Sequence, residues 1–233
     1  MIPNARPIRI ALLGLSLELY QKAIPDTIPR YEAFHRKLRD ILQDCGEVVQ
    51  DGLCYSRAEV EECVFRAETS RADILVVTFQ SYHPSLNSLG ALVRTSLPLI
   101  IWNTQHLGAI GPDFGLAEMI ENHGMHGVQD LCNGLLRSGR RFGLVSGHHA
   151  DPAHLDDLRG WIRAAAAASL SRRLRVGMLG HPFEGMGDFG VDETRMLTDW
   201  GPAVEPVSLA TLAELAQGVD EKTLEEEMER DRE

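Results

Sequence analysis

The chain has 233 residues, of which 44% are hydrophobic, so it can bury a sizeable core. Its formal net charge of −11 argues against nucleic acid and anionic membranes as partners, because both attract clustered Lys and Arg. No signal peptide precedes the first strand pattern, and no apolar run approaches the roughly 20 residues of a membrane span, so we expect a cytoplasmic protein.

Short apolar, β-rich runs alternate with longer stretches of helical periodicity. The runs that predict strands are 8–13, 47–52, 74–79, 97–102, 142–146 and 175–179. Helical patterns cover 30–45, 56–70 and 151–170, with Ser56 and Glu59 as a capping pair. This alternation predicts a doubly wound α/β domain in which crossover helices join five parallel strands.

A basic break at 171–173 separates the third of these helices from a new strand. We therefore place a domain boundary near residue 172, which divides the chain into 1–171 and 172–233. The second part contains a strand, a glycine-rich loop, a short strand at 204–207 and helices, which is too little for an independent α/β domain. We expect this incomplete domain to expose apolar faces and to self-associate.

The cysteines do not form a recognisable motif. They are Cys45, Cys54, Cys63 and Cys132, without C-x-x-C spacing. This pattern predicts reduced thiols, mostly buried and inert, in a reducing compartment.

Loops that follow the strands are the candidate binding region, because ligands of open parallel sheets bind beyond the C-terminal strand ends. The loop at 14–20 has no G-x-G-x-x-G pattern, which argues against a dinucleotide. The loops at 80–84 and 103–106 carry hydrogen-bonding side chains at the edge of an aliphatic sheet. Such a lining suits a small molecule with several hydroxyls, or it satisfies exposed backbone.

The densest polar cluster runs from Asn122 to Asp130, at the start of a predicted helix. His123 and His126 share one face if both are helical, a geometry that can grip a substrate or bind a metal. Asp130 could be a partner for an imidazole or a group on the helix surface. Substrate contact and a structural polar network remain open alternatives, and direct metal ligation is the weaker interpretation.

Two further segments carry unusual residues. His148 and His149 follow the fifth strand, and because adjacent side chains point apart, we assign them to capping and packing. The loop at 180–190 is rich in glycine, which allows close backbone approach to a ligand or to another domain. It lacks the Lys-Ser/Thr ending of a phosphate-binding P-loop, so phosphate binding is not expected.

Taken in order, these segments resemble the L-arabinose isomerases and the related L-fucose-isomerase-like proteins. The resemblance rests mainly on N-H-G-M-H-G-V-Q-D-L-C-N from Asn122 and P-F-E-G-M-G-D-F from Pro182. It implies a metal-dependent aldose–ketose isomerase, usually with manganese, in which a flavodoxin-like N-terminal domain precedes a central α/β domain and a C-terminal domain. It also implies trimers or hexamers in which the N-terminal domain closes over a neighbour's active site.

The resemblance also implies a set of residues that line the sugar pocket, with His126 as the best match. They are Leu17, Leu19, Tyr82, His123, His126 and Met186. L-arabinose isomerases usually carry Gln at the positions of Leu17 and His123, so the chain looks closer to the fucose-isomerase-like branch. The family's Mn²⁺ ligands would follow residue 233, so this chain alone is expected to hold no metal tightly and to supply no catalytic residue.

The sequence therefore predicts an isomerase-family fragment that contributes sugar-pocket and oligomer contacts. Its expected partners are an aldose or ketose, and either copies of itself or a separate catalytic half. The alternative is a non-catalytic sugar-binding or regulatory module of flavodoxin-like fold. A flavin-binding protein is disfavoured because no phosphate-cradling loop follows the first strand.

Overall fold

The computed structural model describes residues 6–112, 114–180, 183–187 and 190–232. The chain divides into two compact units, Met1–Ser169 and Leu170–Glu233, close to the boundary predicted near residue 172. None of the helices in these ranges is both long enough and apolar enough to cross a membrane.

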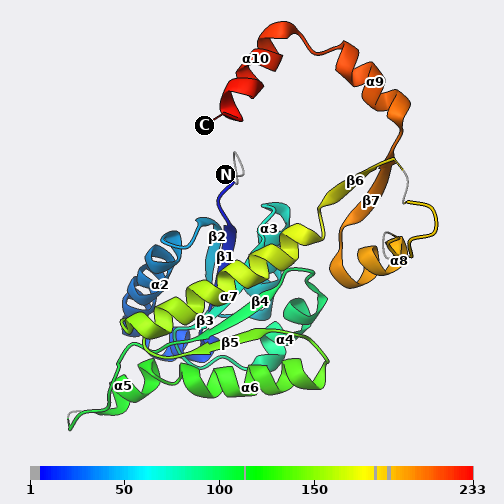
Figure 1. Cartoon of the computed structure of the whole chain (residues 1–233). Helices are drawn as coiled ribbons and strands as arrows, with labels where there is room; N and C mark the ends of the chain where they lie inside the picture. Colours follow the sequence, from blue (N-terminus) through cyan, green and yellow to red (C-terminus); the bar gives the residue numbers. More distant parts are fainter. Residues whose placement is uncertain (1–5, 113, 181–182, 188–189, 233) are drawn as a thin grey trace. The chain divides into compact units, whose positions relative to one another are not determined.

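Unit 1 is built on a five-stranded parallel sheet in the order β2-β1-β3-β4-β5 (Figure 1). Its strands are β1 (Arg9–Leu15), β2 (Glu47–Cys54), β3 (Ile74–Phe79), β4 (Leu99–Asn103) and β5 (Gly143–Ser146). The strand order changes direction between β1 and β3, which is the arrangement of the flavodoxin-like doubly wound fold. The predicted fold class is therefore confirmed.

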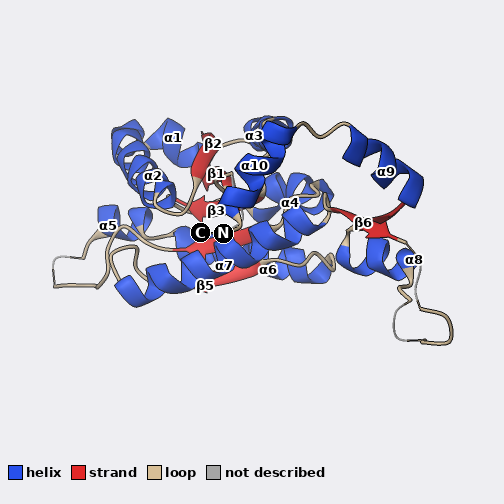
Figure 2. Cartoon of the chain, turned by 45° about the horizontal axis from the view of Figure 1, so that its top comes forward, coloured by secondary structure: helices blue, strands red, loops and turns tan. Residues whose placement is uncertain are grey.

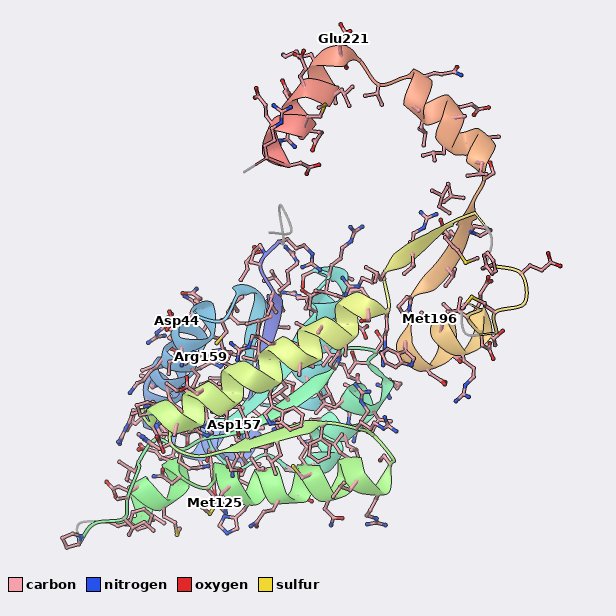
Figure 3. All side chains as sticks on the ribbon, in the orientation of Figure 1. Asp44, Met125, Asp157, Arg159, Met196 and Glu221 are labelled. Atoms are coloured by element: carbon pink, nitrogen blue, oxygen red, sulfur yellow. The ribbon has the colours of Figure 1, made fainter. Side chains whose placement is uncertain are left out.

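Helices cover both faces of this sheet, which lies between them in Figure 2. They are α1 (Glu18–Ala23), the 3₁₀ turn η1 (Pro25–Thr27), α2 (Ile28–Gln43), α3 (Arg57–Thr69), α4 (Ser85–Arg94), α5 (Leu116–Glu121), α6 (Gly124–Arg137) and α7 (Pro152–Ser171). Side chains of α2 and α7 form one core with the sheet, and those of α3, α4 and α6 form the other. Labelled residues locate two of these helices in Figure 3: Asp157 and Arg159 lie on α7, and Met125 lies near the start of α6.

Local sequence explains how these helices begin. The Ser56 hydroxyl accepts the Glu59 backbone N–H at 3.4 Å, and the Glu59 carboxylate accepts the Ser56 N–H at 2.9 Å, so the predicted capping box is confirmed. Helix α2 starts earlier than predicted, because Pro29 is tolerated in the first turn, where a backbone N–H has no helical partner.

In the core, the fully buried Trp102 donates its indole N–H to His154 Nε2 at 2.9 Å.

An ion pair between Arg6 and Asp73, called the latch below, joins two strands at the N-terminal edge of the sheet. Asp73, which precedes β3, is fully buried, and its two carboxylate oxygens accept from the Arg6 guanidinium at 2.8 and 2.9 Å. The same carboxylate accepts the Arg9 backbone N–H at 2.9 Å. A bidentate pair of this kind satisfies a buried charge that would otherwise be costly, so the latch ties the start of β1 to the start of β3.

Unit 2 contains a two-stranded parallel sheet and short helices. Its elements are β6 (Arg175–Leu179), α8 (Glu193–Arg195), the π-helical segment η2 (Met196–Trp200), β7 (Ala203–Val207), α9 (Leu209–Gln217) and α10 (Glu221–Arg230). Large apolar side chains of this unit are exposed, among them Trp200 at 74%, Leu209 at 65% and Leu215 at 63%. The ridge of Leu209, Leu212 and Leu215 on α9 is an exposed apolar face.

We expect the chain to self-associate through this ridge, because contiguous exposed apolar surface drives association in water. Light scattering should give a mass that rises with protein concentration. Leu212→Lys should lower that mass, whereas Gln217→Lys, which adds the same charge to a polar position of the same helix, should not. A monodisperse monomer at all concentrations would contradict the expectation.

Candidate functional site

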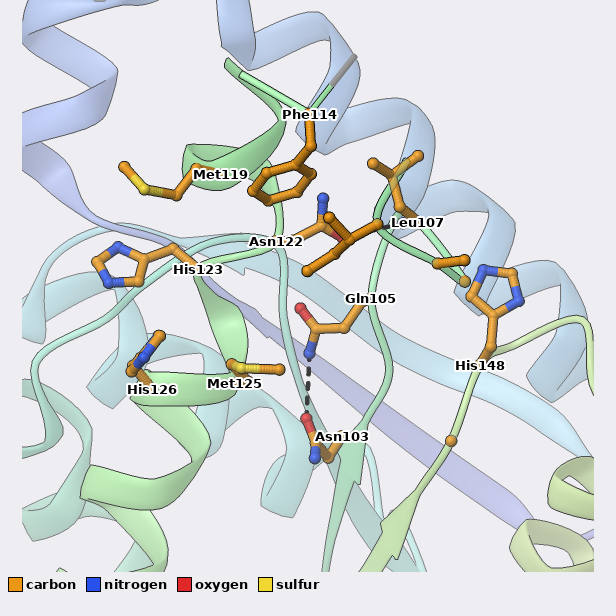
Figure 4. Close-up of a pocket in the computed structure, with 14 residues that line it drawn as sticks. Asn103, Gln105, Leu107, Phe114, Met119, Asn122, His123, Met125, His126 and His148 are labelled. Atoms are coloured by element: carbon orange, nitrogen blue, oxygen red, sulfur yellow. Dashed lines mark hydrogen bonds between the residues drawn. The ribbon is translucent and has the colours of Figure 1, made fainter. Parts of the chain in front are cut away.

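A cavity of about 470 Å³ opens in unit 1, beyond the ends of β4 and β5 (Figure 4). Its volume falls in the range of roughly 300–1,000 Å³ that is typical of small-molecule sites. The described residues that line it are Asn103, Gln105, Leu107, Gly108, Ala109, Ile110, Phe114, Met119, Asn122, His123, Met125, His126, Gly147 and His148. The cavity therefore lies at the sheet edge where ligands of this fold bind.

An aromatic cluster forms one side of the cavity, opposite His148 in Figure 4. His123 caps the start of α6 and His126 lies in its first turn, and their ring centroids are 4.9 Å apart in an edge-to-face arrangement. The Tyr82 ring stacks on His123 at 5.1 Å. Tyr20, from α1, places its hydroxyl 3.2 Å from His123 Nδ1. The structure thus brings together Tyr82, His123 and His126, and it adds Tyr20, which the sequence did not single out.

The hydrogen bond to Tyr20 orients the His123 imidazole. Burial raises the pKa of Tyr20, so the phenol is protonated at neutral pH and can either donate to His123 Nδ1 or accept from it. Burial, with a contribution from His126, lowers the pKa of His123, which favours the neutral ring. In either tautomer the Tyr20 contact occupies Nδ1 and leaves Nε2 for a ligand, as a donor in one tautomer and as an acceptor in the other.

Two amides lie between the histidines. Gln105 donates from Nε2 to Asn103 Oδ1 at 3.1 Å, the bond drawn in Figure 4, and Asn103 donates to the Ser146 hydroxyl at 3.1 Å. Gln105 Oε1 is buried without a protein partner. Asn122 has a structural role instead, because its amide binds Leu107 N–H and the Glu118 carbonyl and closes the loop before α6.

Buried polar atoms without a protein partner gather at this edge of the sheet. Those in the loops after β1, β3, β4 and β5 are Ser16 Oγ, Gln80 Oε1, His83 Nε2, Thr104 Oγ1, Gln105 Oε1, His148 Nε2 and His149 Nε2. Each such group costs about 1–3 kcal/mol when nothing binds it. This edge therefore has hydrogen-bonding capacity that suits water or a ligand with several hydroxyls.

Two further histidines lie in the loops that follow β4 and β5. His106 Nε2 is 3.2 Å from the Gln80 carbonyl oxygen, and His149 Nδ1 is 3.2 Å from the Gln105 carbonyl oxygen. Burial lowers the pKa of each imidazole to about 4. The interpretation that His148 and His149 point apart is wrong, since their ring centroids are 4.1 Å apart. The alternation of side chains holds within a strand, and these residues lie in a turn beyond its end.

Of the predicted site residues, only His123 and His126 are among the described lining residues, and Tyr82 reaches the site through its contact with His123. Leu17 caps α1 and is half-buried, and Leu19 is 63% exposed on the same helix. Met186 belongs to unit 2 and is 46% exposed. In the glycine-rich loop, residues 181–182 and 188–189 lie outside the described residues. Asp130 accepts the Ser85 backbone N–H at 2.9 Å, so it caps α4 and is not a partner of His126.

The residues described do not fit a metal centre. Within the described ranges, no group of three or more His, Cys, Asp or Glu side chains could hold a metal ion. His123 and His126 lack a nearby carboxylate of the kind that Mn²⁺ prefers. The described side chains of this unit therefore do not form a set of ligands that could hold a metal for catalysis.

Comparisons with known proteins leave the family open. No protein-family model matches the chain, and no curated protein matches it. The lac repressor dimer bound to operator and the anti-inducer ONPF aligns over 88% of this chain, with 10% identity and a TM-score of 0.30, and the alignment spans 65% of the repressor chain. Trypanosoma brucei type B ribose 5-phosphate isomerase aligns over 67% of this chain and 99% of its own, with 14% identity and a TM-score of 0.23. Similarities at these TM-scores assign no function.

Proposed function

We propose that this chain is the sugar-contacting N-terminal part of an aldose–ketose isomerase of the L-fucose/L-arabinose type. The observation that supports this best is the pair of His123 and His126 beside the Asn103 and Gln105 amides, on a cavity at the C-terminal sheet edge. Tyr82 stacks on His123 behind this pair. The complete enzyme would hold its Mn²⁺ through residues other than those described. This chain would bind and orient the sugar and exclude water from it.

The chemistry of the lining matches that of a monosaccharide. A sugar presents hydroxyls around its edge and C–H groups on its faces, so it requires both hydrogen-bonding groups and aromatic or apolar surface. His123 Nε2 and the free Gln105 oxygen supply two hydrogen-bonding positions. The rings of His123 and Phe114 line the cavity and supply surface for the C–H groups, and Tyr82 stacks on His123 and supports its ring. A cavity of about 470 Å³ has room for a pentose or a hexose with water.

The same proposal explains the exposed apolar rim of the cavity. Ile110 is 76% exposed, Met119 48% and Met125 45%. In the proposed assembly a neighbouring subunit of a trimer or hexamer, or a separate catalytic half, covers this rim and completes the site. Burial of such a rim would supply the association energy and would remove water from the sugar.

The test is reconstitution with the central and C-terminal domains of an L-fucose-type isomerase, in the presence of Mn²⁺. We expect ketose formation from L-fucose, L-arabinose or D-arabinose to require this chain. His126→Ala should raise KM about tenfold, which corresponds to the loss of one hydrogen bond and a ring contact. Gln129→Ala, at an exposed α6 position outside the lining, is the matched control. Equal activity of the His126→Ala variant and the parent chain would rule out this role for His126.

Experiments on the chain alone separate the alternatives. We expect no ketose formation with Mn²⁺ and no heat in titration calorimetry with any of the three sugars. Sugar binding without metal would favour the non-catalytic sugar-binding module. Ketose formation that EDTA abolishes would show that this chain itself holds the metal.

A further inference from the structure

Cys54 and Cys63 lie side by side in the core of unit 1. Cys54 ends β2 and Cys63 lies in α3, and the two residues are 3% and 5% exposed. A Cβ placed on Gly52 would lie 3.1 Å from Cys63 Sγ and 3.8 Å from Cys54 Sγ. Both sulfur atoms therefore border the same small space above Gly52.

The chain path explains this proximity. After β2 ends at Cys54, the capping box at Ser56 starts α3, which runs back along the strand and returns Cys63 to it. Glycine at position 52 leaves the space open, since any larger side chain would meet the Cys63 sulfur. No short sequence motif marks such a pair, because it depends on a strand and a helix packing together.

The two thiols differ in reactivity. The interaction between the two neighbouring thiols lowers the pKa of Cys63 and raises that of Cys54, whose burial adds to the rise. Gln50 Nε2, at 4.0 Å, adds a second donor to Cys63 Sγ. In contrast, burial raises the pKa of Cys132 to about 11 and also raises that of Cys45. Cys63 is therefore the thiol in this chain best able to act as a nucleophile.

We propose that Cys54 and Cys63 form an oxidisable dithiol that closes to a disulfide in the presence of a peroxide. The Cys63 thiolate attacks one peroxide oxygen, and the O–O bond breaks to give a sulfenic acid and one water after protonation. The Cys54 sulfur then attacks the sulfenic sulfur, the S–O bond breaks, and a second water leaves. In total, two thiols lose two electrons and two protons, and hydrogen peroxide is reduced to two waters.

This bond would act on the segment that leads to Tyr20. The Cys54 carbonyl accepts the Ser16 backbone N–H at 3.0 Å, so Cys54 holds the loop that follows β1. A disulfide would join α3 covalently to that strand end and restrict the unfolded chain. We therefore expect the oxidised protein to unfold at a higher urea concentration than the reduced protein.

The test is oxidation of the full chain with hydrogen peroxide, followed by alkylation and peptide mass analysis. We expect one linked pair of peptides that contains Cys54 and Cys63. Cys45 and Cys132 should stay reduced during oxidation and be alkylated afterwards. Cys63→Ser should abolish the linked pair, and Cys54→Ser should leave a sulfenic acid on residue 63 that dimedone traps. Cys132→Ser, which removes a more distant thiol, should change neither result.

Two outcomes would overturn the proposal. One is oxidation of Cys45 or Cys132 while Cys54 and Cys63 stay reduced and are alkylated. The other is linkage of Cys63 to a cysteine other than Cys54. The peptide map of the parent chain distinguishes these outcomes even if a serine variant does not fold, because it requires no substitution.

Discussion

Unit 1 should lose several kcal/mol of unfolding free energy when the pH falls from 6.5 towards 4. Burial lowers the pKa of His106 and of His149 to about 4, whereas an unfolded histidine titrates near pH 6.5. Between these values the unfolded state binds protons that the folded state does not, so stability is complete above pH 6.5 and falls as the pH drops. Each imidazole then contributes a loss of about 3 kcal/mol, large against a typical total of about 5–15 kcal/mol.

Urea unfolding followed by tryptophan fluorescence at pH 7.5, 6.5, 5.5 and 4.5 measures this loss. His106→Gln should remove only the share of this imidazole, because its amide can still donate to the Gln80 carbonyl without titrating. His83, His123 and His154 also have lowered pKa values and add to the remaining pH dependence. His126→Gln, at an exposed position, should leave the pH dependence intact. Carboxylates with lowered pKa values, such as Asp51 and Glu59, lose their contribution near pH 4 and below, so they affect this window little. An unfolding free energy that is constant between pH 6.5 and 4.5 would contradict the prediction.

Replacement of Gly127 by alanine should destabilise the chain, although alanine is the better helix former by about 1 kcal/mol. A Cβ at this position would lie 2.7 Å from the buried ring of Phe79 and 3.1 Å from the His83 backbone nitrogen. Neither group can move without disturbing the end of β3, so α6 must shift. Overpacking of this kind costs about 1–3 kcal/mol beyond the gain in propensity, and it would displace His123 and His126.

Gly160→Ala is the matched control for this prediction. Position 160 lies inside α7, and a Cβ there would meet nothing within 4 Å, so only the gain in helix propensity remains. We expect this variant to be more stable than the parent chain by roughly 0.5–1 kcal/mol. Equal changes at the two positions, measured by urea unfolding, would show that α6 can move away from Phe79 without cost.

Features set by local sequence could be predicted, and features set by contacts between distant segments could not. The unbroken apolar run at residues 74–77 and the Ser56–Glu59 capping pair predicted their elements, because the strand pattern and the cap act over a few residues. The six-residue helix Leu116–Glu121 is too short for its periodicity to be recognised. The Cys54–Cys63 contact was missed for a different reason, since it exists only once α3 packs on β2.

The residues of the candidate site can likewise be divided into those that local sequence predicts and those that depend on contacts between distant segments. His123 and His126 are neighbours because they are three residues apart at the start of one helix, so their association could be predicted. Leu19 was selected by resemblance alone, and the structure exposes it while Tyr20, the next residue, reaches His123. Which residue of a short helix faces a distant loop depends on how that helix docks, and no local pattern in the loop after β1 encodes it.

The latch of Arg6 and Asp73 lies at the N-terminal edge of the sheet, and the cavity lies at the opposite edge. Substitutions can therefore be divided by position before any library is made. Randomised loops after β3 and β4, at positions such as Gln105, would sample new ligand specificities while the anchoring pair keeps the strands in register. Random changes around Asp73 would mainly lower the yield of folded protein. The fold thus separates the positions where new binding can arise from those on which folding depends.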